Sequence, residues 1–216
     1  MGIRRAGWII GIVLGMALGS ATPIAAAAAP DPQQAQQLVE DVTDQMLAVL
    51  KNNTSDGQVD LDRIRSKVEE IVFPHLDFVT MTKLAVGRHW RDASNDQKRA
   101  LVNEFRTLLV RTYTKSLDEY NNQKLEFLPL RPSPYEDRVK VRSKVVQQGG
   151  PDIPVEYALR YHDGEWSVYD IVIDGVSLVT TYRSSFSSQI DQGSIDALIE
   201  SLRKKNSQNE STGASS

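Results

Sequence analysis

The first third of the chain shows a helical pattern of apolar residues. In 32–51, and again in 61–72, apolar side chains recur three or four positions apart, which is the spacing of one helix face. The two stripes are Leu38, Val42, Met46 and Val49, and then Leu61, Ile64, Val68, Ile71 and Val72. Turn residues at 52–57 separate the stripes, and Pro74 ends the second. The pattern predicts two amphipathic helices.

A short apolar helix and a long amphipathic helix are predicted next. The short one covers 77–84 and breaks near Gly87. Ser94 then begins the longest helix, because Gln97 three residues later completes a capping box. The apolar face of this helix is Leu101, Phe105, Leu108, Leu109, Thr112, Tyr113, Leu117 and Tyr120.

From Leu125 onward the apolar residues alternate with polar ones, which predicts antiparallel strands. The alternating sets are Leu125 and Phe127, then Val139, Val141 and Val145, then Val155, Tyr157, Leu159 and Tyr161. The sequence at 162–165 predicts a tight hairpin turn. In the next strand, Trp166 and Val168 are predicted to face one way and Tyr169, Ile171 and Ile173 the other. The chain then turns at Gly175 straight into an amphipathic helix.

Helices grouped before strands indicate an α+β fold. We expect a single domain, 30–206, in which N-terminal helices pack on a curved antiparallel β-sheet and enclose an apolar cavity. A last helix is predicted at 194–204, and the Ser/Asn-rich tail at 207–216 is expected to be disordered.

The N-terminus has the pattern of a signal peptide, covering 1–29 with cleavage near Ala27 to Ala29. Arg4 and Arg5 precede an apolar run at 8–18, and small residues follow. The run is shorter than the about 20 residues that a membrane span needs. The chain has no cysteine, so a disulfide, a lipoprotein anchor and a thiol nucleophile are all excluded.

The charge of the chain argues against nucleic acid as a partner. The formal net charge is -3, whereas nucleic-acid-binding domains are usually basic. The region 131–144 is locally basic, but its charges alternate with valines, which is typical of the solvent face of a strand.

Two segments resemble the MlaC family, also called the toluene-tolerance family. In the first, the matching residues are Pro74, Asp77, Phe78, Gly87, Trp90, Gln97, Phe105, Leu109, Tyr113 and Leu117. In the second they are Asp174, Gly175, Val176, Ser177, Leu178 and Val179, followed by Tyr182, Arg183 and Phe186. The resemblance covers roughly residues 35 to 206.

The resemblance implies a periplasmic phospholipid carrier that acts as a monomer, without cofactor or metal and without catalysis. Its implied partners are an inner-membrane ABC transporter with a membrane-tethered lipid-binding subunit, and an outer-membrane lipoprotein–porin complex. Its implied role is to maintain outer-membrane lipid asymmetry.

A phospholipid carrier must keep two acyl chains out of water, which represents on the order of 20 kcal/mol at about 0.8 kcal/mol per methylene. Such a site needs an apolar lining and little chemistry. The expected lining is Met81, Leu84, Phe105, Leu109, Tyr113, Val141, Tyr157, Leu159, Tyr169, Ile171, Val176 and Val179. Each of these residues also suits an ordinary core, so the hypothesis rests on the set and the resemblance. Leu109→Trp and Val176→Trp are both expected to give folded, lipid-poor variants.

One alternative is a small enzyme acting on an apolar substrate in the cavity. Asp170, Asp174, His162 and Tyr169 are close in sequence and are its candidate residues. However, Asp174 also suits the turn before the helix, and His162 lies at the predicted hairpin tip.

A second alternative is a periplasmic adaptor that docks envelope proteins without carrying lipid. Trp90, flanked by Arg88, Arg91 and Asp92, would form its docking patch, because Trp and Arg are enriched at interface hot spots. The competing interpretation is that Trp90 packs under the helix that begins at Ser94.

Overall fold

The structure is a computed structural model, and it describes residues 29–55, 58–59, 61–114, 124–147 and 149–213. Nearly all of the predicted signal peptide (1–29) lies outside the described residues, as do the predicted helix residues Leu117 and Tyr120. In the described part of the chain, no helix combines the length and the apolar character that crossing a membrane requires.

The order of elements is helices first and a sheet later, followed by two further helices. The helices are α1 (Pro32–Asn52), α2 (Leu61–Ile71), α3 (Phe78–Val86), α4 (Asn95–Thr114), α5 (Arg183–Gln192) and α6 (Ile195–Gly213). The 3₁₀ turns are η1 (Phe73–His75), η2 (Gly87–Arg91) and η4 (Thr180–Tyr182). The strands are β1 (Thr54–Ser55), β2 (Gln58–Val59), β3 (Lys124–Phe127), β4 (Arg138–Val146), β5 (Ile153–His162), β6 (Glu165–Ile173) and β7 (Val176–Ser177).

The main sheet is antiparallel, with the strand order β3-β4-β5-β6-β7. Asp163 and Gly164 form the predicted tight turn between β5 and β6, and both have positive φ (53° and 91°), as a type I′ hairpin requires. Asp174 and Gly175 repeat this geometry with φ of 49° and 78°. The chain therefore makes a second hairpin, and β7 and η4 precede α5, instead of the predicted direct entry into a helix.

A β-bulge at Tyr169 changes the faces of β6. Leu159 pairs with Val168 and Ala158 pairs with Asp170, so Tyr169 is the extra residue. Beyond the bulge the alternation is inverted, which places Ile171 opposite Tyr157 and on the same face as Val168. The predicted division of β6 into two faces was therefore wrong for Ile171, because strict alternation cannot anticipate a bulge.

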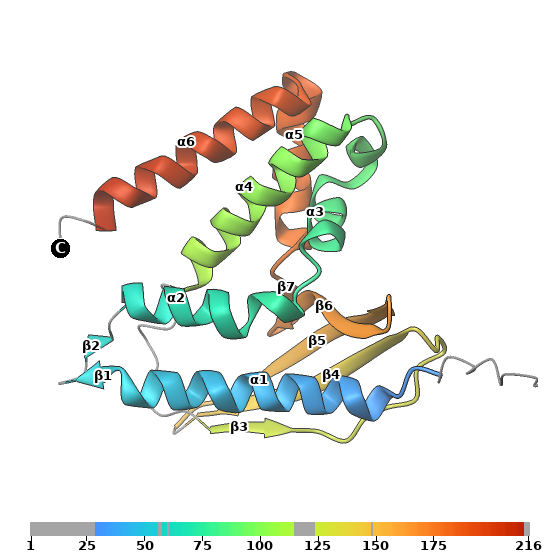
Figure 1. Ribbon diagram of the computed structural model, residues 1–216, viewed down its shortest axis with the longest axis vertical. Coiled ribbons are helices and arrows are strands. Elements are labelled where there is room, and N and C mark those ends of the chain that lie inside the picture. The colour runs from blue at the N-terminus through green and yellow to red at the C-terminus, as the bar shows by residue number, and fades with distance from the viewer. Residues whose placement is uncertain (1–28, 56–57, 60, 115–123, 148, 214–216) are drawn as a thin grey trace, which may run out of the picture.

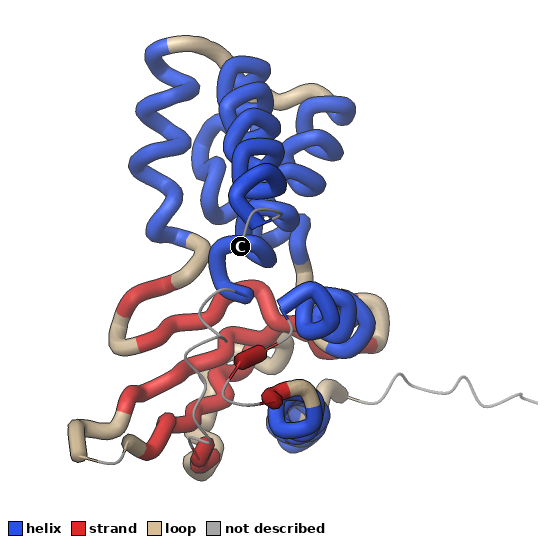
Figure 2. Tube along the Cα trace, turned by 90° about the vertical axis from the view of Figure 1, so that its left-hand side faces the viewer, coloured by secondary structure: helices blue, strands red, loops and turns tan. Residues whose placement is uncertain are grey.

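The helices form two groups around the sheet (Figures 1 and 2). The helices α1 and α2 lie across one face of the sheet, whereas α3, α4, α5 and α6 form a separate bundle beside it. Each group has its own core. The bundle core is Met81, Ala85, Val86, Leu101, Phe105, Leu108, Leu109, Val179, Phe186, Ile190, Leu198, Ile199 and Leu202. The sheet core is Ala35, Val39, Val139, Val141, Leu159, Trp166 and Val168.

The beginning of α1 is fixed to the sheet. Asp31 caps the helix, with its side chain accepting a hydrogen bond from Gln33 N at 2.9 Å. Its main-chain carbonyl accepts a second bond from Trp166 Nε1 at 3.1 Å. Ala35 and Val39 then pack into the sheet core. The first half of α1 is therefore part of the sheet layer.

The beginning of α4 has the predicted capping box. The main-chain N–H of Ser94 donates to Gln97 Oε1 at 2.9 Å, and Gln97 N donates to Ser94 Oγ at 3.2 Å. The same glutamine donates from Nε2 to Asp196 at 3.0 Å, which ties α4 to the start of α6.

The last helix continues past Lys204, where the sequence predicted its end. Asn206 is 6% exposed and donates to the Glu104 carbonyl and carboxylate at 3.0 and 2.9 Å. Arg203 pairs with the same carboxylate at 3.3 Å. These contacts fix α6 along α4, and the helix extends to Gly213, into the segment 207–216 for which disorder was predicted. Residues 214–216 lie outside the described residues.

Candidate functional site

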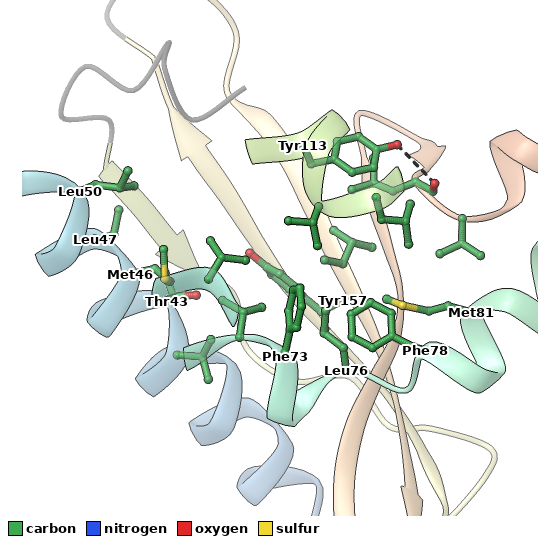
Figure 3. A pocket seen from close by; sticks show the side chains of 18 residues that line it. Thr43, Met46, Leu47, Leu50, Phe73, Leu76, Phe78, Met81, Tyr113 and Tyr157 are labelled. Atoms are coloured by element: carbon green, nitrogen blue, oxygen red, sulfur yellow. Dashed lines mark hydrogen bonds between the residues drawn. The ribbon is translucent and has the colours of Figure 1, made fainter. Parts of the chain in front are cut away.

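An apolar cavity of about 380 Å³ lies between the sheet layer and the helical bundle (Figure 3). Its lining comes from α1, α2, η1, α3, α4, β5 and β6 and from the segment after β7. The lining residues are Val42, Thr43, Met46, Leu47, Leu50, Val68, Val72, Phe73, Leu76, Phe78, Met81, Leu109, Val110, Tyr113, Tyr157, Ile171, Leu178 and Val179. None of these side chains carries a charge at neutral pH. A smaller space, lined in addition by Leu38, Val39, His75 and Val168, extends the cavity along α1.

Among the described residues, the only side-chain oxygen atoms in the lining are the hydroxyls of Thr43, Tyr113 and Tyr157. The Tyr113 hydroxyl donates to the Leu178 carbonyl at 3.3 Å, so the end of α4 is tied to the segment after β7. Burial raises the pKa of Tyr157, and the hydroxyls of Ser143 and Thr43 offset part of that rise. Both phenols are therefore neutral at physiological pH.

Burial, together with the neighbouring phenol of Tyr182, raises the pKa of Tyr113 from 10.0 to about 12. Because the folded state holds this proton more tightly than the unfolded state, folding stability falls as the pH rises from about 10 to about 12. We expect an ultraviolet titration of phenolate absorbance to show a late step, measured while circular dichroism reports the folded state. Tyr113→Phe should remove the part of this step near pH 12.

The matched control is Tyr135→Phe, which removes a phenol from a residue that is 59% exposed and should leave the late step in place. A Tyr113→Phe variant whose titration curve differs from the wild-type curve no more than the control does would contradict the assignment.

The structure brings part of the predicted lining together at this cavity. The predicted residues that line it are Met81, Leu109, Tyr113, Tyr157, Ile171 and Val179. Phe105, Val141 and Leu159 are fully buried in the two packed cores and do not line this cavity. For Phe105 the reason is its edge-to-face packing on Tyr182 and Phe186, with ring centroids 5.3 and 5.4 Å apart.

Three further predicted lining residues lie elsewhere. Leu84 and Tyr169 line a separate polar pocket, Leu84 because it faces away from the cavity on α3 and Tyr169 because it is the bulged residue of β6. Val176 is 57% exposed, because the β6–β7 hairpin places it at the edge of the sheet. The structure therefore does not bring these three side chains to the apolar cavity.

The sequence reasoning missed the contribution of the first two helices. The second half of α1 supplies Thr43, Met46, Leu47 and Leu50, and α2 supplies Val68. The sequence signal for this contribution is the apolar stripe that contains Leu38, Val42 and Met46. An apolar stripe shows that one face of a helix is buried, but not whether that face packs against other side chains or lines a cavity. The stripe therefore could not distinguish cavity-lining residues from core residues.

A buried polar network holds the segment that closes the cavity after β7. Ser177 Oγ lies 2.9 and 2.7 Å from the two carboxylate oxygens of Asp170, which is 9% exposed. The same hydroxyl accepts a hydrogen bond from Thr180 N at 2.9 Å, and Asp170 also accepts one from Ile171 N at 2.9 Å. The network therefore fixes the chain that carries Leu178 and Val179 into the cavity.

The four residues proposed for a cavity enzyme do not come together at one site. Asp170 bonds to Ser177, Asp174 lies in the hairpin turn, and His162 Nδ1 pairs with Asp163 at 2.9 Å at the other hairpin tip. Tyr169 lies in the polar pocket on the other side of α3. The described residues also contain no group of three or more His, Asp or Glu side chains that could hold a metal ion.

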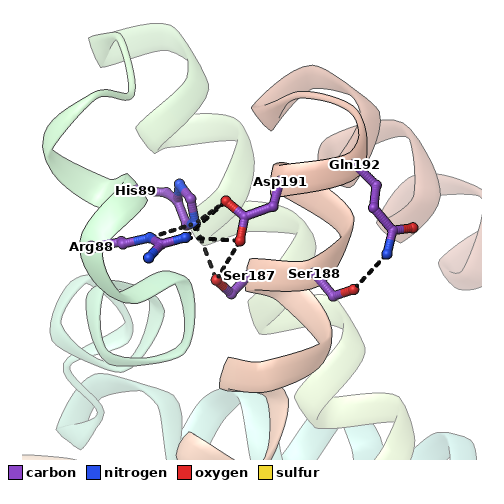
Figure 4. Close-up of polar contacts among 6 residues, drawn as sticks. All are labelled: Arg88, His89, Ser187, Ser188, Asp191 and Gln192. Carbon is purple, nitrogen blue, oxygen red and sulfur yellow. Dashed lines mark hydrogen bonds and ion pairs between the residues drawn. The ribbon is translucent and has the colours of Figure 1, made fainter.

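In the proposed docking patch, Trp90 packs on the helical bundle and Arg88 forms an ion pair. Trp90 is partly buried against the bundle core, with Lys98 Nζ 5.7 Å from its ring centroid, which agrees with the packing interpretation. Arg88 donates to both carboxylate oxygens of Asp191 at 2.9 Å (Figure 4). This arginine, together with the nearby His89, lowers the pKa of Asp191. Both Asp191 and Ser187 approach Nε2 of His89, at 3.4 and 3.2 Å, so these side chains do not form a nucleophile–base–acid relay.

The fold and the cavity together define an α+β protein with a binding site for an apolar ligand, because the uncharged lining can bury apolar surface. A family model described as MlaC protein matches residues 40–204. The chain belongs to the MlaC family.

Curated relatives and a solved structure agree with this assignment. The chain is 25% identical over 182 residues to a toluene tolerance protein of Pseudomonas putida, covering 84% of this chain and 83% of that protein. It is 22% identical over 175 residues to the intermembrane phospholipid transport system binding protein MlaC of Haemophilus influenzae, covering 79% and 81%. It also resembles the structure of a phospholipid-binding protein from Ralstonia solanacearum in complex with a phospholipid, with 30% identity and a TM-score of 0.73, covering 82% of this chain and 98% of that one.

Proposed function

We propose that this protein is a periplasmic phospholipid carrier, which holds acyl chains in the cavity and moves lipid between the outer membrane and an inner-membrane ABC transporter. The observation that carries the proposal is the cavity lining, in which every side chain is uncharged. The relatives support it, since one is named as a phospholipid transport binding protein and a similar structure holds a phospholipid.

The cavity fits the physical task of a carrier. Acyl chains that leave a membrane lose about 0.8 kcal/mol for each methylene exposed to water, so the carrier must shield most of their length. Valine, leucine, methionine and phenylalanine side chains supply that shield here. Methionines such as Met46 and Met81 adapt to different chain shapes, because their thioethers are flexible and polarizable. The polar headgroup stays hydrated outside the apolar lining.

Carriage between two membranes implies docking at each of them. The proposed donor and acceptor are an outer-membrane lipoprotein–porin complex and an inner-membrane ABC transporter with a tethered lipid-binding subunit. Movement of lipid between them would maintain the lipid asymmetry of the outer membrane.

Native mass spectrometry of the mature protein from a periplasmic extract, followed by lipid extraction, tests this proposal. The expected result is co-purified diacyl phospholipid at one or two molecules per chain. A protein that is lipid-free as isolated, and that also takes up no phospholipid from vesicles, would overturn it.

A further inference from the structure

A second pocket, of about 400 Å³, lies on the opposite side of α3 from the apolar cavity. Phe78 and Met81 of this helix line the cavity, whereas Thr80, Lys83 and Leu84 line the second pocket. The helix is about 10 Å across, so it separates the two spaces. The second pocket is therefore a distinct site, which the proposed carriage of acyl chains does not use.

The charge of this pocket is opposite to that of the whole chain. Its lining contains Lys83, Arg138, Arg160 and Arg183 but only one acidic residue, Asp137. The chain as a whole has a formal net charge of -3. The cations come from α3, β4, β5 and α5, which are far apart in the sequence, so only the fold brings them together. Tyr169, displaced by the bulge, adds a phenol.

The acidic residues near the pocket only partly neutralise these cations. Arg160 donates to Thr80 Oγ at 2.9 Å, and its Nη1 lies 3.5 Å from Asp77 Oδ2, which anchors it at the start of α3. Asp137 lies 3.8 Å from Arg138 Nε, at the outer limit of an ion pair. Within the described residues, no ion pair is formed by Lys83 or Arg183.

Arg183 is held at the pocket by the shape of η2. Its guanidinium lies across Gly87, where a Cβ atom would be 3.1 Å from Arg183 Nε. Gly87 has a φ of 66°, a conformation that side-chain-bearing residues rarely adopt. Both residues are among those that resemble the MlaC family, yet neither lines the cavity. By contrast, Arg88, the next residue in η2, donates from Nη2 to both carboxylate oxygens of Asp191 (Figure 4).

We propose that this basic pocket is a phosphate-binding site, in which Lys83, Arg160 and Arg183 contact the oxygens of one phosphate group. A phosphate offers three acceptor oxygens in different directions, so it can accept from donors that surround it. A carboxylate is planar and is matched by the fork of a single guanidinium. Donors that arrive from separate elements around a concave pocket therefore favour phosphate. Its source is either a phospholipid headgroup at a membrane surface or a free phosphate.

Isothermal titration calorimetry with inorganic phosphate at low ionic strength tests the site. We expect saturable binding, weakened by about tenfold or more in the double variant Lys83→Gln/Arg183→Gln, because each charge-assisted hydrogen bond contributes strongly. The matched control is Arg99→Gln/Lys205→Gln, which removes the same two kinds of charge from exposed positions elsewhere. The control should bind phosphate within about twofold of the wild type.

Vesicles containing phosphatidylglycerol identify the source. If the ligand is a lipid headgroup, the protein should sediment with these vesicles. Inorganic phosphate should then release it, and the double variant should not sediment. Phosphate binding without vesicle binding would identify a free phosphate. Both results support the site.

The proposal is overturned if phosphate does not bind saturably. It is also overturned if the double variant and the control lose the same amount of affinity for phosphate. It is also overturned if a glutamate-rich peptide binds and phosphate does not, since that would indicate an acidic protein partner. The Leu109→Trp variant, which alters only the apolar cavity, should keep phosphate binding. Loss of lipid carriage and loss of the phosphate site are therefore distinguishable.

Discussion

Leu109→Trp is expected to give a folded protein whose affinity for phospholipid is more than tenfold lower. Leu109 lies on α4 and lines the cavity, where an indole ring would occupy space that an acyl chain needs. If the ring displaces only two methylenes, the loss is about 1.6 kcal/mol at about 0.8 each, which corresponds to more than a factor of ten. Native mass spectrometry and uptake of labelled phospholipid from vesicles measure the change.

Val176→Trp is the control for this experiment. Its side chain is 57% exposed at the β6–β7 hairpin, so the added ring extends into solvent and lipid content should match the wild type. Overpacking at Leu109 costs about 1–3 kcal/mol of stability, so thermal unfolding must confirm that both variants are folded. Equal lipid content in the wild type and a folded Leu109→Trp variant would contradict the proposed lining.

Ser177→Ala is expected to lower the free energy of unfolding by about 2 kcal/mol, because the buried Asp170 carboxylate loses its hydroxyl partner. The main-chain N–H of Thr180 loses its acceptor in the same change. For a domain of this size, the melting temperature should fall by roughly 4–8 °C. Thermal unfolding followed by circular dichroism measures this shift.

The network also positions the cavity wall, so Ser177→Ala should release phospholipid faster as well. Ser184→Ala, an exposed serine at the start of α5, is the matched control and should change stability by less than about 0.5 kcal/mol. Ser177→Thr keeps a hydroxyl and should recover part of the lost stability. The interpretation fails if Ser177→Ala melts at the same temperature as the Ser184→Ala control.

Features that depend on neighbouring residues could be predicted from the sequence. The capping box at Ser94 and Gln97 and the turn at Asp163 and Gly164 are local, and both are confirmed. The apolar stripes likewise predicted the helices correctly, because a stripe must be buried against something. The α+β class followed from the order of these elements.

Which residues line the cavity could not be predicted from the sequence. Phe105 and Leu109 are one turn apart on the same helix face, yet Phe105 packs on aromatic rings and Leu109 lines a space. Their residue types do not differ in any way that predicts this. The bulge at Tyr169 has no local signal either, and it alone moves Ile171 into the cavity and Tyr169 away from it. Packing between distant elements decides both outcomes.

The anchoring of α1 has a mechanical consequence. The helix is attached to the sheet at one end, through the bond from Trp166 to the Asp31 carbonyl and through Ala35 and Val39. Its other end contributes Met46 and Leu47 to the wall of an empty space. If α1 rotates about its attached N-terminal end, the residues near its C-terminal end, at the cavity, are displaced the most. We therefore expect a longer or bulkier cargo to displace this end of α1 first, because the second half of the helix contributes no residue to either core.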